Sequence, residues 1–161
     1  MSPKLKLADF GSTKGLGVIT DESVEQGQYI CSYEGPILTY RNAVETEKRY
    51  DQHDAGSYMF FFRHPLTDAK LCVDATFFDL LPGHGRQLLL DEANAYLKST
   101  GISRYLNHSR RGNMNVKSEM FHGAARLAFY ASENIAKGTE LTYDYGERRK
   151  EILSAFPWLL D

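Results

Sequence analysis

The chain has 161 residues, 42% of them hydrophobic and 25% charged, and carries a formal net charge of −2. This composition predicts one globular domain with a real core, and its mild acidity disfavours nonspecific nucleic-acid binding, which requires a basic face. No apolar run reaches the length of a membrane span, and the N-terminus lacks a secretory pattern. We therefore expect an intracellular domain, or a fragment of a longer intracellular protein.

The cysteines and histidines indicate neither a disulfide framework nor a metal site. The two cysteines, Cys31 and Cys72, lie in apolar, strand-like surroundings and form no Cys-x-x-Cys pair. We interpret both as small buried hydrophobic residues. The five histidines are not spaced like zinc ligands. We therefore expect no metal.

The first third of the chain predicts strands joined by glycine turns. Residues 5–21 read as a strand, a turn and a second strand. The turn Lys14-Gly15-Leu16-Gly17 has no third glycine, so it fails as a dinucleotide-binding fingerprint. It lets the backbone approach a ligand closely, or it is simply a hairpin turn. The stretch 23–35 resembles 134–146 in the spacing of its aliphatic, glycine and aromatic residues, which suggests related positions in one sheet system.

The rest of the chain adds short helices and further strands. A polar helix is predicted over 42–50, followed by a hairpin of strands at 58–62 and 71–76. Residues 87–98 follow a helical pattern that ends near Gly101.

The last part of the chain predicts a strand over 126–131 and a short helix over 148–156. Many short strands, few helices and frequent glycine turns together favour a β-rich α+β domain.

Two short stretches of unusual composition suggest a function. Residues 104–109 read Arg-Tyr-Leu-Asn-His-Ser, and residues 140–146 read Glu-Leu-Thr-Tyr-Asp-Tyr-Gly. Each stretch alone is typical of a strand that ends in a turn. Their order along the chain, after the glycine turn at 14–17 and before the C-terminal tail, makes a specific combination.

Together with Tyr33-Glu34-Gly35, Tyr58 and the stretch 72–76, these motifs resemble the SET-domain protein lysine methyltransferases in order and over nearly the whole chain. The tail narrows the resemblance to the branch that monomethylates histone H4 at lysine 20. In the tail, Glu147-Arg148 is followed by Ala155-Phe156-Pro157-Trp158-Leu159. That branch ends in a helix and a tryptophan, where many relatives carry a cysteine-rich zinc segment.

The resemblance implies a fold of small β-sheets wrapped around a C-terminal pseudoknot, with few short helices. It implies a single SET domain over 1–161, with a helical tail at 147–161 in place of a zinc-binding segment and a helical insertion at 77–103. S-adenosylmethionine and a peptide would bind on opposite faces, joined by a narrow channel for the target lysine. S-adenosylhomocysteine would be the product.

The resemblance also implies residue roles. Tyr145 would be the catalytic tyrosine that orients the lysine amine, Tyr143 the hydroxyl that restricts the product to one methyl group, and Tyr33 a third hydroxyl on the lysine. The implied cofactor-binding residues are Lys14, Gly15, Leu16, Gly17, Tyr58, Arg104, Asn107, His108 and Trp158. The nearest branch tends to have arginine where Leu16 stands, so one side-chain contact would be missing.

Structural roles stay open for three of these residues. Arg104 would then pair with a buried acid, His108 would be a satisfied core histidine, and Trp158 would close the hydrophobic core.

The implied substrate is a basic histone-tail peptide or a nucleosome. Lysine 20 of histone H4 is the first candidate for the methylated residue. The implied protein is a nuclear monomer that binds no metal, no membrane and no specific nucleic-acid sequence. Another histone or nonhistone lysine stays open, because the insertion at 77–103 would lie near the peptide groove or the cofactor mouth. An inactive SET-fold binding module is a third reading, which the tyrosines at 33, 143 and 145 and the Asn107-His108 pair disfavour.

Overall fold

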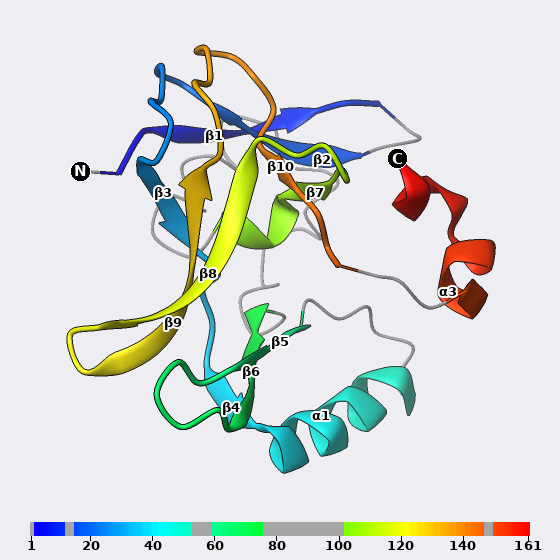
Figure 1. The fold of residues 1–161 in the computed structure, drawn as a ribbon. Helices are drawn as coiled ribbons and strands as arrows, with labels where there is room; N and C mark the ends of the chain where they lie inside the picture. The colour runs from blue at the N-terminus through cyan, green and yellow to red at the C-terminus, as the bar shows by residue number, and fades with distance from the viewer. Residues whose placement is uncertain (1, 12–14, 53–58, 76–101, 147–149) are drawn as a thin grey trace, which may run out of the picture. The chain divides into compact units, whose positions relative to one another are not determined.

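The computed structural model describes residues 2–11, 15–52, 59–75, 102–146 and 150–161 (Figure 1). Its strands are β1 Leu5–Asp9, β2 Leu16–Thr20, β3 Tyr29–Ser32, β4 Ile37–Thr39, β5 Met59–Arg63, β6 Lys70–Asp74, β7 Asn107–His108, β8 Met114–Phe121, β9 Ala124–Ala131 and β10 Thr142–Tyr143. Its helices are α1 Tyr40–Gln52 and α3 Lys150–Ala155, with 3-10 turns η3 Ser103–Tyr105 and η4 Pro157–Leu160. These elements confirm the predicted β-rich α+β class. The predicted helix at 87–98 lies outside the described residues.

The residues form two compact units. The first comprises Met1–Cys31, Tyr105–Val116 and Phe129–Asp161, and the second comprises Ser32–Arg104 and Lys117–Ala128. No described helix is long and apolar enough to cross a membrane.

The first unit opens with the predicted strand, turn and strand. β1 and β2 pair antiparallel, with Leu5 opposite Thr20 and Asp9 opposite Leu16. The turn closes through a 2.9 Å hydrogen bond from Phe10 N–H to the carbonyl of Gly15. Gly15 has φ 76°, in the left-handed region that glycine tolerates best. The turn thus includes Gly15 of the predicted turn at 14–17, whereas Leu16 and Gly17 already belong to β2.

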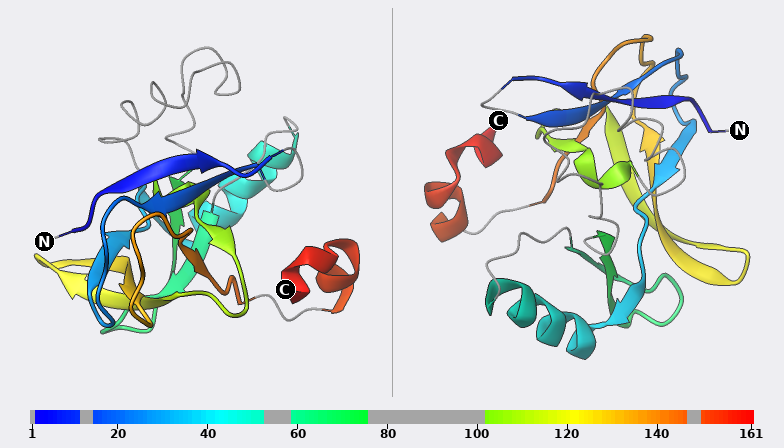
Figure 2. Two further views of the ribbon diagram at one scale, coloured as in Figure 1. Left: turned by 90° about the horizontal axis from the view of Figure 1, so that it is seen from above. Right: turned by 180° about the vertical axis from the view of Figure 1, so that it is seen from behind.

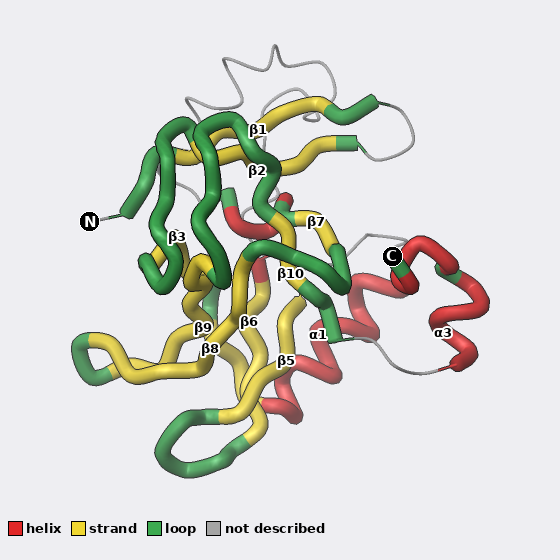
Figure 3. The backbone as a smooth tube through the Cα atoms, turned by 45° about the horizontal axis from the view of Figure 1, so that its top comes forward, coloured by secondary structure: helices red, strands yellow, loops and turns green. Residues whose placement is uncertain are grey.

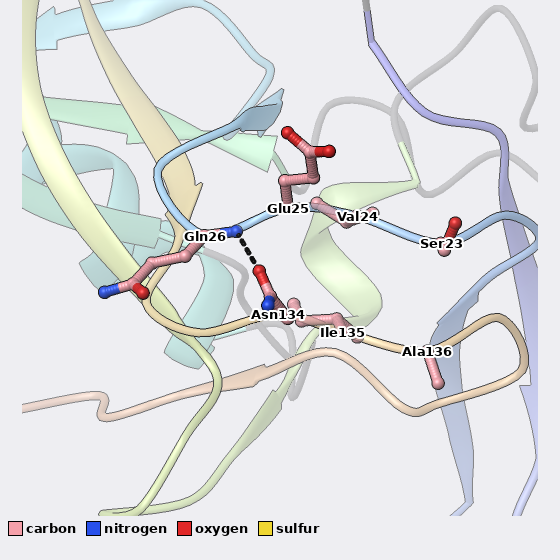
Figure 4. Close-up of a pocket in the computed structure, with 7 residues that line it drawn as sticks. All are labelled: Ser23, Val24, Glu25, Gln26, Asn134, Ile135 and Ala136. Atoms are coloured by element: carbon pink, nitrogen blue, oxygen red, sulfur yellow. Dashed lines mark hydrogen bonds between the residues drawn. The ribbon is translucent and has the colours of Figure 1, made fainter.

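The two similar stretches, 23–35 and 134–146, meet inside the first unit. Val24 and Ile135 hold equivalent places in them, and they exchange both backbone hydrogen bonds at 2.8 Å. Figure 4 shows these residues at an open pocket, where Gln26 N–H donates to Asn134 Oδ1 at 2.9 Å. The glycine turns of the two stretches, at Gly27 and Gly138, also make equivalent backbone hydrogen bonds. The equivalent hydrogen bonds run from Gly27 N–H to Ala131 O (2.8 Å) and from Gly138 N–H to Thr20 O (2.7 Å).

Strands β7 and β10 of the first unit form a short parallel pair (Figure 3). Each strand belongs to one of the two motifs, at 104–109 and 140–146. Asn107 is opposite Thr142, and His108 is opposite Tyr143. The loop after β7 packs directly on β10. The two segments pass so closely that a Cβ on Gly112 would lie 2.6 Å from the carbonyl oxygen of Thr142. This close passage of the loop and β10 agrees with the pseudoknot that the resemblance implies.

The second unit contains the antiparallel sheet β4-β6-β5, against which helix α1 packs (Figure 2). The predicted hairpin is confirmed as β5 and β6, with Met59 opposite Asp74. Cys72 and Ala43 are fully buried, so the reading of Cys72 as a small hydrophobic residue is confirmed. Cys31 is only half-buried, so the prediction of a buried residue is wrong at that position.

The remaining sheet has the order β3-β9-β8. β8 and β9 are joined by a turn in which His122 and Gly123 have φ values of 49° and 81°. Two left-handed residues in sequence are typical of the tight turns that suit the twist of a hairpin. Ile30 and Phe129 are fully buried in this sheet, which confirms the predicted strand over 126–131 as the C-terminal part of β9.

Candidate active site

Tyr143 and Tyr145 are two residues apart, and the structure gives them different environments. Tyr143 is 5% exposed, and its ring meets Phe129 edge to face at 4.8 Å. Tyr145 is 39% exposed, with its ring 5.0 Å from that of Tyr143. One tyrosine is therefore fixed in the core while the other presents a surface to solvent.

Hydrogen bonds hold Tyr145 at its backbone and at its hydroxyl. Its backbone N–H donates to His108 Nδ1 at 3.0 Å, and its phenol donates to the carbonyl oxygen of Leu106 at 2.7 Å. The next turn is closed by Asp144, whose Oδ1 accepts from Gly146 N–H at 2.8 Å. A carbonyl can only accept, so the phenol proton points at the carbonyl oxygen of Leu106.

His108 connects Tyr145 to the C-terminal segment. Its side chain is 1% exposed, and its Nε2 lies 2.8 Å from the carbonyl oxygen of Leu159. Because Nδ1 accepts from Tyr145 and Nε2 faces an acceptor, the ring is the neutral tautomer with its proton on Nε2. The ring thus fills the core role that the sequence left open. Its contact with a cofactor stays a prediction.

Trp158 on η4 completes an aromatic cluster with Tyr145 and His108. Its ring centroid lies 6.2 Å from that of Tyr145 and 6.0 Å from that of His108, both edge to face. The residue is 52% exposed, whereas its neighbour Leu159 is buried. Core closure therefore belongs to Leu159, and Trp158 keeps a free aromatic surface.

The two glycines of the turn at 14–17 have different surroundings. A Cβ on Gly15 would meet no atom of the described residues within 4 Å, so a ligand can approach the backbone there. A Cβ on Gly17 would lie 2.6 Å from Glu140 Oε2 and 2.7 Å from Asn107 Nδ2. Gly15 therefore fits the predicted close approach, and Gly17 makes room for two side chains of the protein itself.

Asn107 is held beside this turn. Its Nδ2 donates to the carbonyl oxygen of Leu16 at 3.1 Å and to Glu140 Oε2 at 2.8 Å. Glu140 has no role among the predicted site residues, although it belongs to the motif at 140–146. Asn113 is a second residue outside the predicted set. It is buried, its Nδ2 donates to the carbonyl oxygen of Glu140 at 2.9 Å, and its Oδ1 accepts from Thr142 N–H at 3.0 Å.

Two predicted site residues lie in the second unit. Tyr33 is buried, with its ring edge to face on Phe60 at 5.5 Å. Arg104 is also buried and donates from Nη1 to the carbonyl of Ala75 at 3.4 Å.

The first unit brings together the remaining described site residues, which are Gly15, Leu16, Gly17, Asn107, His108, Tyr143, Tyr145 and Trp158. Lys14 and Tyr58 lie outside the described residues. Within the described ranges, no group of His, Cys, Asp and Glu is placed to hold a metal ion.

Comparison with known proteins identifies relatives along most of the chain. The SET domain family model matches residues 15–146. Histone-lysine N-methyltransferase Set8 of Drosophila melanogaster is 34% identical over 147 residues, which are 91% of this chain and 18% of that protein. N-lysine methyltransferase KMT5A-A of Danio rerio is 33% identical, covering 91% and 36%. Histone-lysine N-methyltransferase set-1 of Caenorhabditis elegans is 33% identical, covering 92% and 53%. The chain thus spans between about a fifth and about half of these relatives.

Solved structures agree with this comparison. CpSET8 from Cryptosporidium superposes with a TM-score of 0.69 at 26% identity, covering 92% of this chain and 60% of that one. The structure of ctPRC2 in an autoinhibited conformation bound to S-adenosylmethionine gives a TM-score of 0.63 at 22% identity, covering 98% of this chain and 17% of that one. At that identity the second likeness concerns the fold alone.

Proposed function

Because the chain belongs to the SET-domain family, we propose that it is an S-adenosylmethionine-dependent protein lysine N-methyltransferase, which adds one methyl group to lysine 20 of histone H4. The observation that carries the proposal is the fixed pair of tyrosines, Tyr143 and Tyr145, beside an open glycine turn and an exposed tryptophan. The relatives named histone-lysine N-methyltransferase support the reaction. The choice of lysine 20 rests on the resemblance of the tail at 147–159.

The residues of the first unit fit the cofactor by their chemistry. An adenine ring needs an aromatic surface, which Trp158 offers. The cofactor must pass close to the main chain of the protein, and Gly15 leaves room for it because it has no Cβ. The cationic amino-acid part of the cofactor needs a hydrogen-bond acceptor, such as Asn107 Oδ1. When bound, S-adenosylmethionine would supply a methyl group activated on a sulfonium.

Tyr145 acts by orientation in this proposal. Its phenol donates to the carbonyl of Leu106, which holds the hydroxyl in one direction. A tyrosine ordinarily titrates at about pH 10, so this group is a poor general base near neutrality. Its lone pairs instead accept a hydrogen bond from the lysine amine and aim the nitrogen. The amine loses its proton more readily in an aromatic, partly dry channel, where the charged form is disfavoured.

Tyr143 limits the reaction to one methyl group. Burial against Phe129 fixes its ring, so the phenol cannot swing away from a methylated amine. A hydroxyl at that place takes the room that a second methyl group would need. Phenylalanine at this position would release that room.

The remaining predictions belong to the same proposal. Lys14, Leu16, Gly17, Tyr58, Arg104 and His108 would add contacts to the cofactor, and Tyr33 would bond the lysine amine. Residues 1–161 would form one SET domain with a tail at 147–161 and an insertion at 77–103. The protein would act as a monomer on the histone H4 tail or on nucleosomes, and would therefore work in the nucleus.

Mass spectrometry of nucleosomes incubated with the protein and S-adenosylmethionine tests the proposal. We expect one methyl group on lysine 20 of histone H4, its loss in Tyr145→Phe, and a second methyl group in Tyr143→Phe. Tyr40→Phe is the matched control, because this exposed tyrosine lies on α1 in the second unit. Methylation of another lysine would refute the substrate but keep the reaction. No methylation by a protein that binds the cofactor would refute the enzyme.

A further inference from the structure

Glu140 has a place in the first unit that the proposed chemistry does not explain. Its carboxylate is half-buried and accepts the 2.8 Å hydrogen bond from Asn107 Nδ2. The two residues are 33 positions apart, so the contact is made by the fold rather than by the local sequence. The second proton of Nδ2 goes to the carbonyl of Leu16, also an acceptor.

These two acceptors determine how the Asn107 amide is oriented. A carboxylate and a carbonyl can only accept hydrogen bonds, so both must face Nδ2. A flipped amide would place Oδ1 against two oxygens and lose both bonds. The present orientation leaves Oδ1 as an acceptor, and among the described residues it receives no hydrogen bond.

The surroundings hold this arrangement in place. Asn113 fixes the backbone of Glu140 through a 2.9 Å bond to its carbonyl. The missing side chain of Gly17 provides the space where the two side chains meet, since a Cβ there would lie within 2.7 Å of both. The site therefore combines a glycine, a carboxylate and an amide at one point beside the open backbone of Gly15.

We propose that Glu140 is a positioning residue, which holds Asn107 with Oδ1 ready to accept a hydrogen bond from the ammonium group of the cofactor's amino-acid part. The inference rests on the proposed function, because it concerns the same cofactor. An amide oxygen recognises an ammonium, and the nearby carboxylate adds an attractive field for a cation. Glu140 acts through Asn107 rather than by touching the reacting atoms.

Calorimetric titration separates this role from a merely structural one. The ligands are S-adenosylhomocysteine and its analogue without the α-amino group. In Glu140→Leu we expect affinity for S-adenosylhomocysteine to fall about tenfold, as for one charged hydrogen bond, while affinity for the analogue stays within about twofold. Glu140→Gln keeps an acceptor oxygen at the same reach and should retain most of the preference for the amino group. Glu133→Leu, an exposed acid of the same unit, is the control.

Three results would overturn the inference. One is an equal loss of both ligands in the leucine variant, which would show general damage to the cleft. Another is unchanged affinity for S-adenosylhomocysteine in that variant. The third is an equal loss of preference in the glutamine and leucine variants. If the leucine variant does not fold, Glu140→Asp replaces it, because the shorter side chain keeps the charge but loses the reach. A wild-type protein that binds neither ligand would instead refute the proposed function.

Discussion

Gly112→Ala tests whether the passage of the loop against β10 sets the stability of the site. The new carbon would lie 2.6 Å from the carbonyl oxygen of Thr142 and 2.7 Å from the Cα of Tyr143. Ordinary contact begins at 3.4 Å, so the two backbone segments must separate by about 3.4 − 2.6 = 0.8 Å. Both contacts are to backbone atoms, which cannot turn aside as a side chain would. Overpacking of this kind costs about 1–3 kcal/mol.

For a chain of this length, a loss of about 2 kcal/mol lowers the melting temperature by about 4–8 °C. Calorimetric or circular-dichroism melting measures the change in melting temperature. Binding of S-adenosylhomocysteine should weaken as well, because β10 pairs with β7, which carries the proposed cofactor residues Asn107 and His108. The control is Gly123→Ala, which introduces backbone strain at φ 81° but whose Cβ would meet no atom within 4 Å in the part of the chain that the structure describes. A Gly112→Ala protein as stable as wild type would refute the argument, since it would mean that β10 moves away from the loop without any loss of the free energy of unfolding.

Three further variants or measurements follow from the structure. Trp158→Ala should weaken cofactor binding in calorimetry by about tenfold with little change in melting temperature, because the ring is half exposed. Burial, and then the charge of nearby acids, raises the pKa of the Cys72 thiol to about 12, so a thiol reagent should modify Cys31 first and Cys72 only on unfolding. Desolvation raises the pKa of the Glu34 carboxyl in the folded protein above its ordinary value of 4.5. The folded state therefore favours the protonated carboxyl, and the free energy of unfolding falls as the pH rises above about 4.5. Glu34→Gln should remove that decline in urea unfolding measured across pH.

Local patterns predicted the elements that close over short distances. The hairpin of β5 and β6 was readable because apolar runs flank a turn of six residues, from His64 to Ala69. Helix α1 begins two residues earlier than predicted, because Thr39 Oγ1 accepts from Asn42 N–H at 3.3 Å and caps the helix. That signal was in the sequence, since threonine is a good capping residue.

Pairings between distant segments could not be predicted in the same way. β7 and β10 contain two residues each, too few for any periodicity, and only the fold sets their parallel register. Asn113 gave no signal because a lone asparagine in a glycine-containing loop usually indicates a turn. The family resemblance supplied the residues that are proposed to face a ligand. It did not supply Glu140 or Asn113, which act inside the protein.

The hydrogen bonds that assemble the first unit are also the ones that orient its functional groups. His108 uses one nitrogen on Tyr145 and the other on Leu159, so the tyrosine and the C-terminal segment share one buried ring. Replacing His108 should therefore loosen the tail and Tyr145 together, and variants there should lose stability and activity in parallel. Trp158 differs because it contacts the His108 ring only edge to face and is half exposed. Substitution at Trp158 is thus the change in this cluster by which ligand affinity can be separated from folding.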